Sequence, residues 1–410
     1  MIPKGWSSQK LSSVASIIDC KHRTPEYVKS GIPLVSPGTI KWGALDLISP
    51  VKRVTEEEYR SLMDHCVVEQ GDLVMSRNQS VGVVSYVDSK KPFVLGQDTV
   101  LIKPIHADWR FIYYTLQSDL VQRQIAKSAG GSTFSRINLS DIRALNIKTP
   151  AIYEQDKISQ ILSAWDKAIS VTESLLANSQ QQKKALTQQL LTGEKRLLDE
   201  NGVRFSGEWK ITKLIQMGKV VSGGTPDTNM AMYWEGDILW LTPTDVTALT
   251  GRFVSNTSRK ITPAGLLNSS AVLLPKGSLM VCTRATIGAL AISTSEICTN
   301  QGFKNIIPNE GFNIEFIYYL LQMNTNEMIK KSSGSTFLEL SKKDFETLSF
   351  SCPFIKEQQK IAAVLSAADT EISTLEKKLA CLNDEKKALM QQLLTGKRRV
   401  KVDAEEAVSA

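Results

Sequence analysis

Polar residues of the types that contact DNA follow apolar runs at corresponding places in the two halves of the chain. An arginine can pair bidentately with guanine, an asparagine or glutamine can pair with adenine, and hydroxyl groups can bind phosphate. The residues of this kind are Arg77, Asn78, Gln79 and Gln97 in the first half and Thr283, Arg284, Thr286 and Gln301 in the second. Their recurrence predicts a DNA-binding surface in each half, with Arg77 and Arg284 in corresponding places.

A short loop rich in glycine and hydroxyl groups also occurs in each half. The sequence Gly-Ser-Thr-Phe begins at Gly131 and again at Gly334. Small residues let the loop approach another backbone closely, which adds five candidates for DNA binding: Ser132, Thr133, Arg136, Ser335 and Thr336. The alternative is that each loop precedes a core phenylalanine and that the arginines are solvated surface residues, because common descent also preserves structural loops.

No catalytic, cofactor-binding or metal-binding group of residues stands out in the sequence. The chain has only three histidines, no GxxxxGK[ST] phosphate loop, no GxSxG motif and no CxxC or HExxH spacing. A nuclease with a weak Asp…Glu-x-Lys pattern remains open. The six cysteines form no regular framework, which predicts reduced thiols in a cytoplasmic protein.

The length and charge of the chain limit the number of domains and the kinds of partner that can be expected. A chain of 410 residues predicts two or three domains. Lysine and arginine number 49 against 42 acidic residues, so the net charge is +7. This modest excess permits an anionic partner such as DNA but does not require one. No run of about 18 apolar residues occurs, which predicts that no segment spans a membrane.

The chain is an internal repeat with an offset of 203 residues. Residues 150–196 align without a gap to residues 353–399, with 26 identities in 47 positions. Between residues 131 and 149, only 6 of 19 positions are identical at the same offset. This unequal divergence predicts that the long segments share one task, whereas the globular parts do related but different ones.

Each long segment carries apolar residues in alternating steps of three and four, the pattern of a coiled-coil seam. The seam residues are Ile158, Leu162, Trp165, Ile169 and Leu176 in the first copy and Ile361, Leu365, Ile372, Leu375, Leu379 and Leu382 in the second. The pattern predicts two helices of about 39 residues, each roughly 58 Å long. An antiparallel pair is favoured because isolated helices of this kind are not stable in water. The alternative is that each helix packs only on its own globular part.

The globular parts contain short alternating stretches separated by glycine, proline and asparagine, which predict strands. One helix is expected in each part, near residues 109–127 and 314–331. The predicted fold is therefore α+β, with two tandem α/β domains joined by two long helices in an antiparallel coiled coil, as a pseudo-two-fold internal repeat. The predicted boundaries are 1–150 and 197–352 for the domains, 151–196 and 353–399 for the helices, and 400–410 for a tail.

These features together resemble the specificity (S) subunit of type I restriction–modification enzymes over nearly the whole chain. The resemblance is carried by the two globular halves, the Gly-Ser-Thr-Phe loops, the helix starts at Pro150 and Pro353, and the Leu-Leu-Thr-Gly segments that end at Gly193 and Gly396. It implies that the globular halves are target recognition domains, each reading one half of a split, asymmetric DNA site. It also implies that the helices set the gap between the half-sites.

The resemblance further implies partners and cofactors. Two methyltransferase (M) subunits are expected to dock on the helices, and restriction–translocase (R) subunits are expected to join that core. S-adenosylmethionine would then be bound by M, and ATP and Mg²⁺ by R, with no cofactor on this chain and no catalysis by it. Two competing hypotheses are a stand-alone nuclease or methyltransferase and a coiled-coil scaffold without DNA function.

Overall fold

The computed structural model describes residues 2–50, 52–130, 135–334 and 338–401 of the chain. These residues divide into two compact units. Unit 1 consists of the described residues within 1–173 and 377–401, and unit 2 consists of those within 174–376. Both long helices, α5 (Ile152–Leu191) and α12 (Ile355–Leu393), therefore contribute one part to each unit. Each helix end is grouped with the domain next to it because it packs on that domain, and the boundaries drawn from the sequence stay a prediction.

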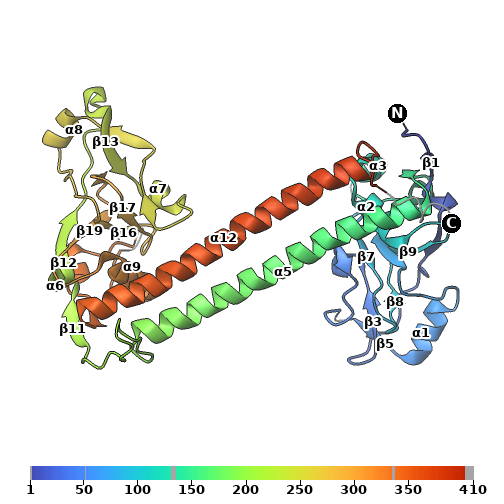
Figure 1. Ribbon diagram of the computed structural model, residues 1–410, viewed down its shortest axis with the longest axis horizontal. Coiled ribbons are helices and arrows are strands. Elements are labelled where there is room, and N and C mark those ends of the chain that lie inside the picture. The colour runs from blue at the N-terminus through green and yellow to red at the C-terminus, as the bar shows by residue number, and fades with distance from the viewer. Residues whose placement is uncertain (1, 51, 131–134, 335–337, 402–410) are drawn as a thin grey trace. The chain divides into compact units, whose positions relative to one another are not determined.

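The described residues of the unit 1 domain form short strands and α-helices (Figure 1). The strands are β1 (Ser7–Lys10), β2 (Ala15–Asp19), β3 (Ile32–Val35), β4 (Gly43–Ala44), β5 (Arg53–Val54), β6 (Leu73–Ser76), β7 (Val84–Tyr86), β8 (Val94–Leu95), β9 (Thr99–Pro104) and β10 (Asn146–Thr149). The helices are α1 (Glu56–Met63), α2 (Trp109–Gln117), α3 (Asp119–Ala129) and α4 (Leu139–Arg143). Among the described residues, the strands form sheets in the orders β2-β9-β6-β7-β4, β5-β3-β8 and β1-β10.

The domain of unit 2 repeats this plan. Its strands are β11 (Lys210–Lys213), β12 (Gly218–Ser222), β13 (Trp234–Leu241), β14 (Phe253–Val254), β15 (Arg259–Ile261), β16 (Leu279–Cys282), β17 (Leu290–Ser293), β18 (Cys298–Thr299), β19 (Phe303–Pro308) and β20 (Ser349–Cys352). Its helices are α6 (Leu214–Met217), α7 (Pro243–Thr247), α8 (Pro263–Leu267), α9 (Ile314–Met323), α10 (Thr325–Lys330) and α11 (Lys342–Glu346). The described sheets follow the matching orders β12-β19-β16-β17-β14, β15-β13-β18 and β11-β20, so both units are α+β as predicted.

The prediction of one helix near residues 109–127 is wrong, because two helices lie there. Ser118 has an extended backbone with φ −64° and ψ 145°, which ends α2. Its side chain accepts a hydrogen bond from the backbone of Val121 and so caps α3. A second break at Asn324 separates α9 from α10 in unit 2.

The ends of the long helices complete the domain cores. In unit 1, Ile158 and Leu162 of α5 are buried in one cluster with Leu393, the last residue of α12, and with Leu394 just after it. In unit 2, Leu190 of α5 lies in the core together with Ile361 and Leu365 of α12. The two alternatives for the helices are thus both partly right, since each helix packs on domains and also pairs with the other helix.

Ion pairs show that the helices run antiparallel in unit 1. The guanidinium Nε of Arg399, just after α12, lies 2.6 Å from Glu154 Oε1 near the start of α5. Further along α5, Asp166 Oδ1 lies 2.5 Å from the ammonium of Lys386, which is earlier in α12. The residue number therefore rises along one helix as it falls along the other.

The same pairing recurs in unit 2 with the roles of the helices exchanged. Arg196 Nε lies 2.6 Å from Glu357 Oε1, and Lys183 pairs with Asp369. Lys183 and Lys386 both fall at seam positions of the heptad pattern, where a lysine normally costs stability. Their aspartate partners explain how the seam accommodates them.

The predicted seam is most deeply buried near the domains. Ile158, Leu162, Ile361 and Leu365 are at most 1% exposed. The remaining seam residues are half-buried: Trp165, Ile169, Leu176, Ile372, Leu375, Leu379 and Leu382. No described helix is both long and apolar enough to cross a membrane, and none of the six cysteines is paired in a disulfide.

We expect Leu162→Ala to lower the free energy of unfolding by about 2–5 kcal/mol, because it leaves a cavity in the unit 1 core. Leu175→Ala is the matched control on the same helix, since Leu175 is 48% exposed and its truncation should cost less than about 0.5 kcal/mol. Urea unfolding followed by circular dichroism measures both. Equal losses in the two variants would contradict the anchoring of α5 in the domain core.

Candidate nucleic-acid interface

The loop between β6 and β7 is a tight turn in a strained conformation. The backbone N–H of Gly82 donates to the carbonyl of Ser76 at 2.9 Å, which closes the turn. At its tip, Gln79 has φ +60°, a left-handed conformation that residues other than glycine rarely adopt. Strained backbone of this kind concentrates at binding sites, and it presents the exposed Gln79 side chain to solvent.

Two other segments join this turn. The backbone N–H of Arg77 donates to the carbonyl of Asp98 at 2.8 Å, and the N–H of Ile137 donates to the carbonyl of Arg77 at 3.0 Å. The guanidinium of Arg136 then pairs with the Asp98 carboxylate at 2.8 Å. The structure therefore brings Asn78, Gln79, Gln97 and Arg136 to one place, although they come from three separate parts of the sequence.

The unit 2 turn is built in the same way. The N–H of Gly288 donates to the carbonyl of Cys282 at 2.9 Å, and the tip residue Ala285 has φ +62°. The N–H of Leu340 donates to the carbonyl of Thr283 at 2.8 Å. Beside this bond, the guanidinium of Arg284 lies 3.9 Å from the Glu339 carboxylate.

The correspondence of Arg77 with Arg284 needs correction. Ser76 and Cys282 end equivalent strands, so Arg77 corresponds to Thr283 and Arg284 corresponds to Asn78. The Arg77 side chain is 6% exposed and pairs with Asp19 at 2.8 Å. It also donates to the carbonyl of Ile137 at 3.2 Å. The buried Arg77 side chain therefore stabilises the turn and does not face solvent.

The other predicted residues differ in exposure. Thr283 is fully buried, with its hydroxyl 3.2 Å from the carbonyl of Gly302. Asn78 is half-buried, and the exposed candidates are Gln79, Gln97, Arg136, Arg284, Thr286 and Gln301. Four candidates lie outside the described residues: Ser132, Thr133, Ser335 and Thr336. Whether any of these residues contacts DNA stays a prediction.

Two glutamines of the set, Gln97 and Gln301, each have a threonine partner on a neighbouring loop. Gln97 Nε2 donates to Thr24 Oγ1 at 3.2 Å in unit 1. Thr225 and Gln301 are also paired in unit 2, where the threonine hydroxyl donates to the amide oxygen of the glutamine. Both threonines are followed by proline, and this repeated Thr-Pro pair is the sequence feature that could have indicated the two loops.

Sequence reasoning missed Asp98 and Glu339, because an acidic residue gives no hint of DNA binding until its arginine partner is seen.

One group of possible metal ligands lies beside Arg77. Ligand atoms of Asp19, Cys20 and His22 lie within 4.8 Å of one another. The Asp19 carboxylate already accepts from Arg77, and it lies 3.1 Å from His22. Burial, and then the nearby Asp19 charge, raise the pKa of the Cys20 thiol, which disfavours the thiolate that a metal would need. These contacts are better explained as support for the buried Arg77 side chain than as a metal site.

The chain resembles known proteins along both units. The family model described as type I restriction modification DNA specificity domain matches residues 3–178 and again residues 206–383. These two matches coincide with the two copies of the internal repeat.

Similar proteins include three type I restriction enzyme specificity subunits. The MjaIX subunit of Methanocaldococcus jannaschii is 40% identical over 172 residues, which is 42% of this chain and 40% of that protein. The EcoR124I/EcoR124II subunit of Escherichia coli is 30% identical over 223 residues, which is 52% of each chain. The chain thus spans about half or less of these two relatives. The putative MjaX subunit of Methanocaldococcus jannaschii is 25% identical and matches 98% of this chain and 95% of that protein.

Two solved structures share the fold across nearly the whole chain. The S subunit from M. genitalium matches with a TM-score of 0.60 and 17% identity over 96% of each chain. The HsdS subunit from Thermoanaerobacter tengcongensis matches with a TM-score of 0.52 and 18% identity, over 97% of this chain and 98% of that one. With a family model that matches twice, this chain belongs to the type I restriction modification DNA specificity domain family.

Proposed function

We propose that this chain is the DNA-recognition subunit of a type I restriction–modification complex. Each unit reads one half of a split, asymmetric DNA site with its turn and the two segments joined to it. The two long helices hold the units and set the gap between the half-sites. The chain itself carries out recognition, and the reactions on DNA belong to partner subunits.

The observation that carries this proposal is that both units have the same turn backbone but different side chains on it. The strained turn and its backbone hydrogen bonds are the same in both units. On that scaffold, Asn78 of unit 1 is replaced by Arg284 in unit 2. Arginine and asparagine prefer different bases in the major groove, so such an exchange is what two different half-sites require.

The long helices support a proposal about partners. Their sequences are far more alike than those of the domains, with 26 of 47 positions identical. Two identical methyltransferase subunits would impose that likeness by docking on equivalent surfaces of both copies. The restriction–translocase subunits would join this core. S-adenosylmethionine would then be held by the methyltransferase subunits, and ATP and Mg²⁺ by the translocase subunits.

The charge of the chain agrees with shared DNA binding. Phosphate contacts dominate the affinity of most DNA-binding proteins and require many lysines and arginines. This chain has a net charge of only +7 over 410 residues, and Arg136 is already paired with an acidic residue at the turn of unit 1. Partner subunits that enclose the duplex would supply the remaining phosphate contacts.

Arg284→Ala should relax recognition of one half-site only. The loss of one bidentate arginine–guanine contact costs about 1–3 kcal/mol of discrimination. This loss of discrimination is measured by binding of the reconstituted complex to DNA duplexes with single base changes in either half-site. Asn78→Ala in unit 1 is the matched variant and should act on the other half-site. If either variant relaxed both half-sites equally, the model of two separate readers would be wrong.

Lengthening both helices by one heptad should lengthen the tolerated gap. Seven residues added between Leu176 and Ala177, with seven between Glu376 and Lys377, keep the seam in phase and add about 10 Å. That length equals roughly three base pairs of duplex, at 3.4 Å per base pair. Binding to duplexes with altered gaps measures the preference, and insertion in one helix only is the control that should impair folding. A complex that kept its original gap would contradict the spacing role.

A further inference from the structure

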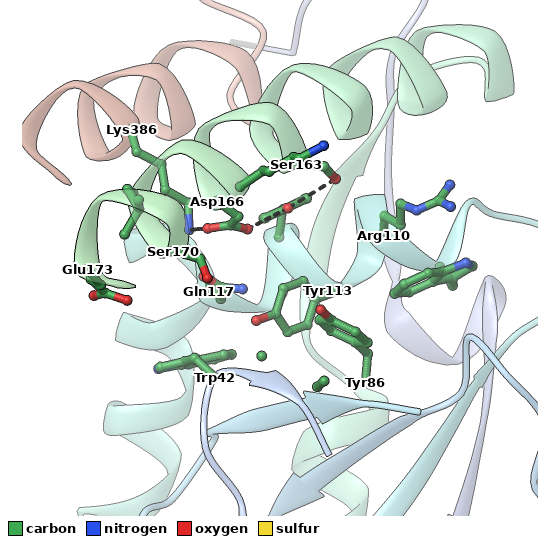
Figure 2. Close-up of a pocket in the computed structure, with 16 residues that line it drawn as sticks. Trp42, Tyr86, Arg110, Tyr113, Gln117, Ser163, Asp166, Ser170, Glu173 and Lys386 are labelled. Carbon is green, nitrogen blue, oxygen red and sulfur yellow. Dashed lines mark hydrogen bonds and ion pairs between the residues drawn. The ribbon is translucent and has the colours of Figure 1, made fainter. Parts of the chain in front are cut away.

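A cavity of about 640 Å³ in unit 1 lies between the domain and the paired helices. Five aromatic residues line it: Trp42, Tyr86, Trp109, Tyr113 and Tyr114. Figure 2 shows Trp42 and Tyr86 facing the cavity from one side and Asp166 of α5 facing it from the other. Aromatic walls with a few polar groups are typical of a binding pocket, and this one is lined by none of those predicted DNA-binding residues that the structure describes.

Unit 2 fills the equivalent space with its own arginine. The side chain of Arg252 is 12% exposed. Its guanidinium lies 2.8 and 3.0 Å from Glu315 Oε2, donates to Ser366 Oγ and lies 3.6 Å from Asp369 Oδ2. It also lies 4.6 Å from the ring centroid of Phe253. An arginine therefore fits between a domain and the helix pair of this fold.

Glycine stands at the same place in unit 1. Ala44 of β4 and Phe253 of β14 pair with equivalent residues of the neighbouring strand, so Gly43 and Arg252 are counterparts. Gly43 has φ +120°, and no described atom lies within 4 Å of the point where a Cβ would be. The backbone is thus open toward the cavity where unit 2 carries a side chain.

The acceptors that hold Arg252 are kept in unit 1 as Ser163 and Asp166. The hydroxyl of Tyr114 lies 2.6 Å from Asp166 Oδ2 and 3.2 Å from Ser163 Oγ. The ammonium of Lys386 lies 2.5 Å from Asp166 Oδ1. A carboxylate offers about four acceptor positions, so Asp166 can accept further hydrogen bonds from a cation inside the cavity.

One difference weakens the likeness, because Arg110 stands where unit 2 has Glu315. The Arg110 guanidinium lies 4.9 Å from the ring centroid of Trp109 and 4.0 Å from Asp108. In Figure 2 it points away from Asp166. A second carboxylate, Glu173, lines the cavity, and the added aromatic faces attract a planar guanidinium.

We propose that this cavity binds the arginine side chain of a segment from a partner protein. The guanidinium would lie where Arg252 lies in unit 2, bonded to Asp166 and Ser163 and stacked on the aromatic wall. The volume exceeds what one side chain fills, since cavities of roughly 300–1,000 Å³ hold ligands of drug size. The occupant is therefore a stretch of chain that carries an arginine.

The test measures binding of a capped Gly-Arg-Gly peptide to the full chain by saturation-transfer NMR. A Gly-citrulline-Gly peptide is the neutral control. We expect the citrulline peptide to bind at least about tenfold more weakly, the scale of lost charge-assisted hydrogen bonds. Free L-arginine should bind more weakly than the arginine peptide, because it lacks the flanking residues.

Variants place the peptide in this cavity. Gly43→Arg should abolish binding by filling the site from within. Gly43→Ala carries the same backbone strain and should retain binding. Adding Arg252→Gly to Gly43→Arg should restore binding, now in unit 2, and should raise the thermal stability of that double variant when the arginine peptide is added.

Several results would overturn the proposal. Equal binding of the arginine and citrulline peptides would show that charge plays no part. Preferential binding of a Gly-Glu-Gly peptide would show that Arg110, rather than Asp166, selects the occupant. Equal affinity for free L-arginine would replace a protein segment with a small-molecule ligand. Unchanged binding by Gly43→Arg would place the peptide elsewhere on the chain.

Discussion

The burial of helix ends inside the domain cores is the constraint on which the rest of the structure depends. A pair of long helices leaves much of its seam half-buried, and helices of this kind need tertiary packing to be stable. Leu162 and Leu393 in unit 1 provide that packing, as do Leu190 and Leu365 in unit 2. Because each core contains both helices, neither domain can turn on the helix pair without opening its own core.

Charged residues reinforce this anchoring at the same places. Asp166 accepts hydrogen bonds from a domain tyrosine and from Lys386 of the partner helix, and Asp369 does the same with Tyr319 and Lys183. Burial, and then the bond to Asp166, raise the pKa of Tyr114, so the phenol stays protonated and can donate. Each aspartate thus ties one domain to both helices. Anchoring of the domains is therefore one constraint that both helices share, in addition to the docking of partner subunits proposed above.

Sequence reasoning predicted the large features because they depend on local periodicity. The helix pair follows from the heptads, and the two units follow from the repeat. Sequence reasoning could not predict contacts between residues that are distant in the sequence. Arg77 looked like a base-reading residue until Asp19, 58 positions away, was seen to pair with it. Equally, Gly43 and Arg252 could be recognised as counterparts only from the register of the strands. The helix break at Ser118 depends on a side-chain cap, which the hydrophobic pattern does not reveal.

Mapping of methylated adenines in cells that express this chain with a type I methyltransferase subunit tests the central claim most directly. Two readers fixed to one pair of helices predict a split motif, with two different half-sites separated by one constant gap. A continuous motif, or two half-sites found at many different gaps, would contradict the account.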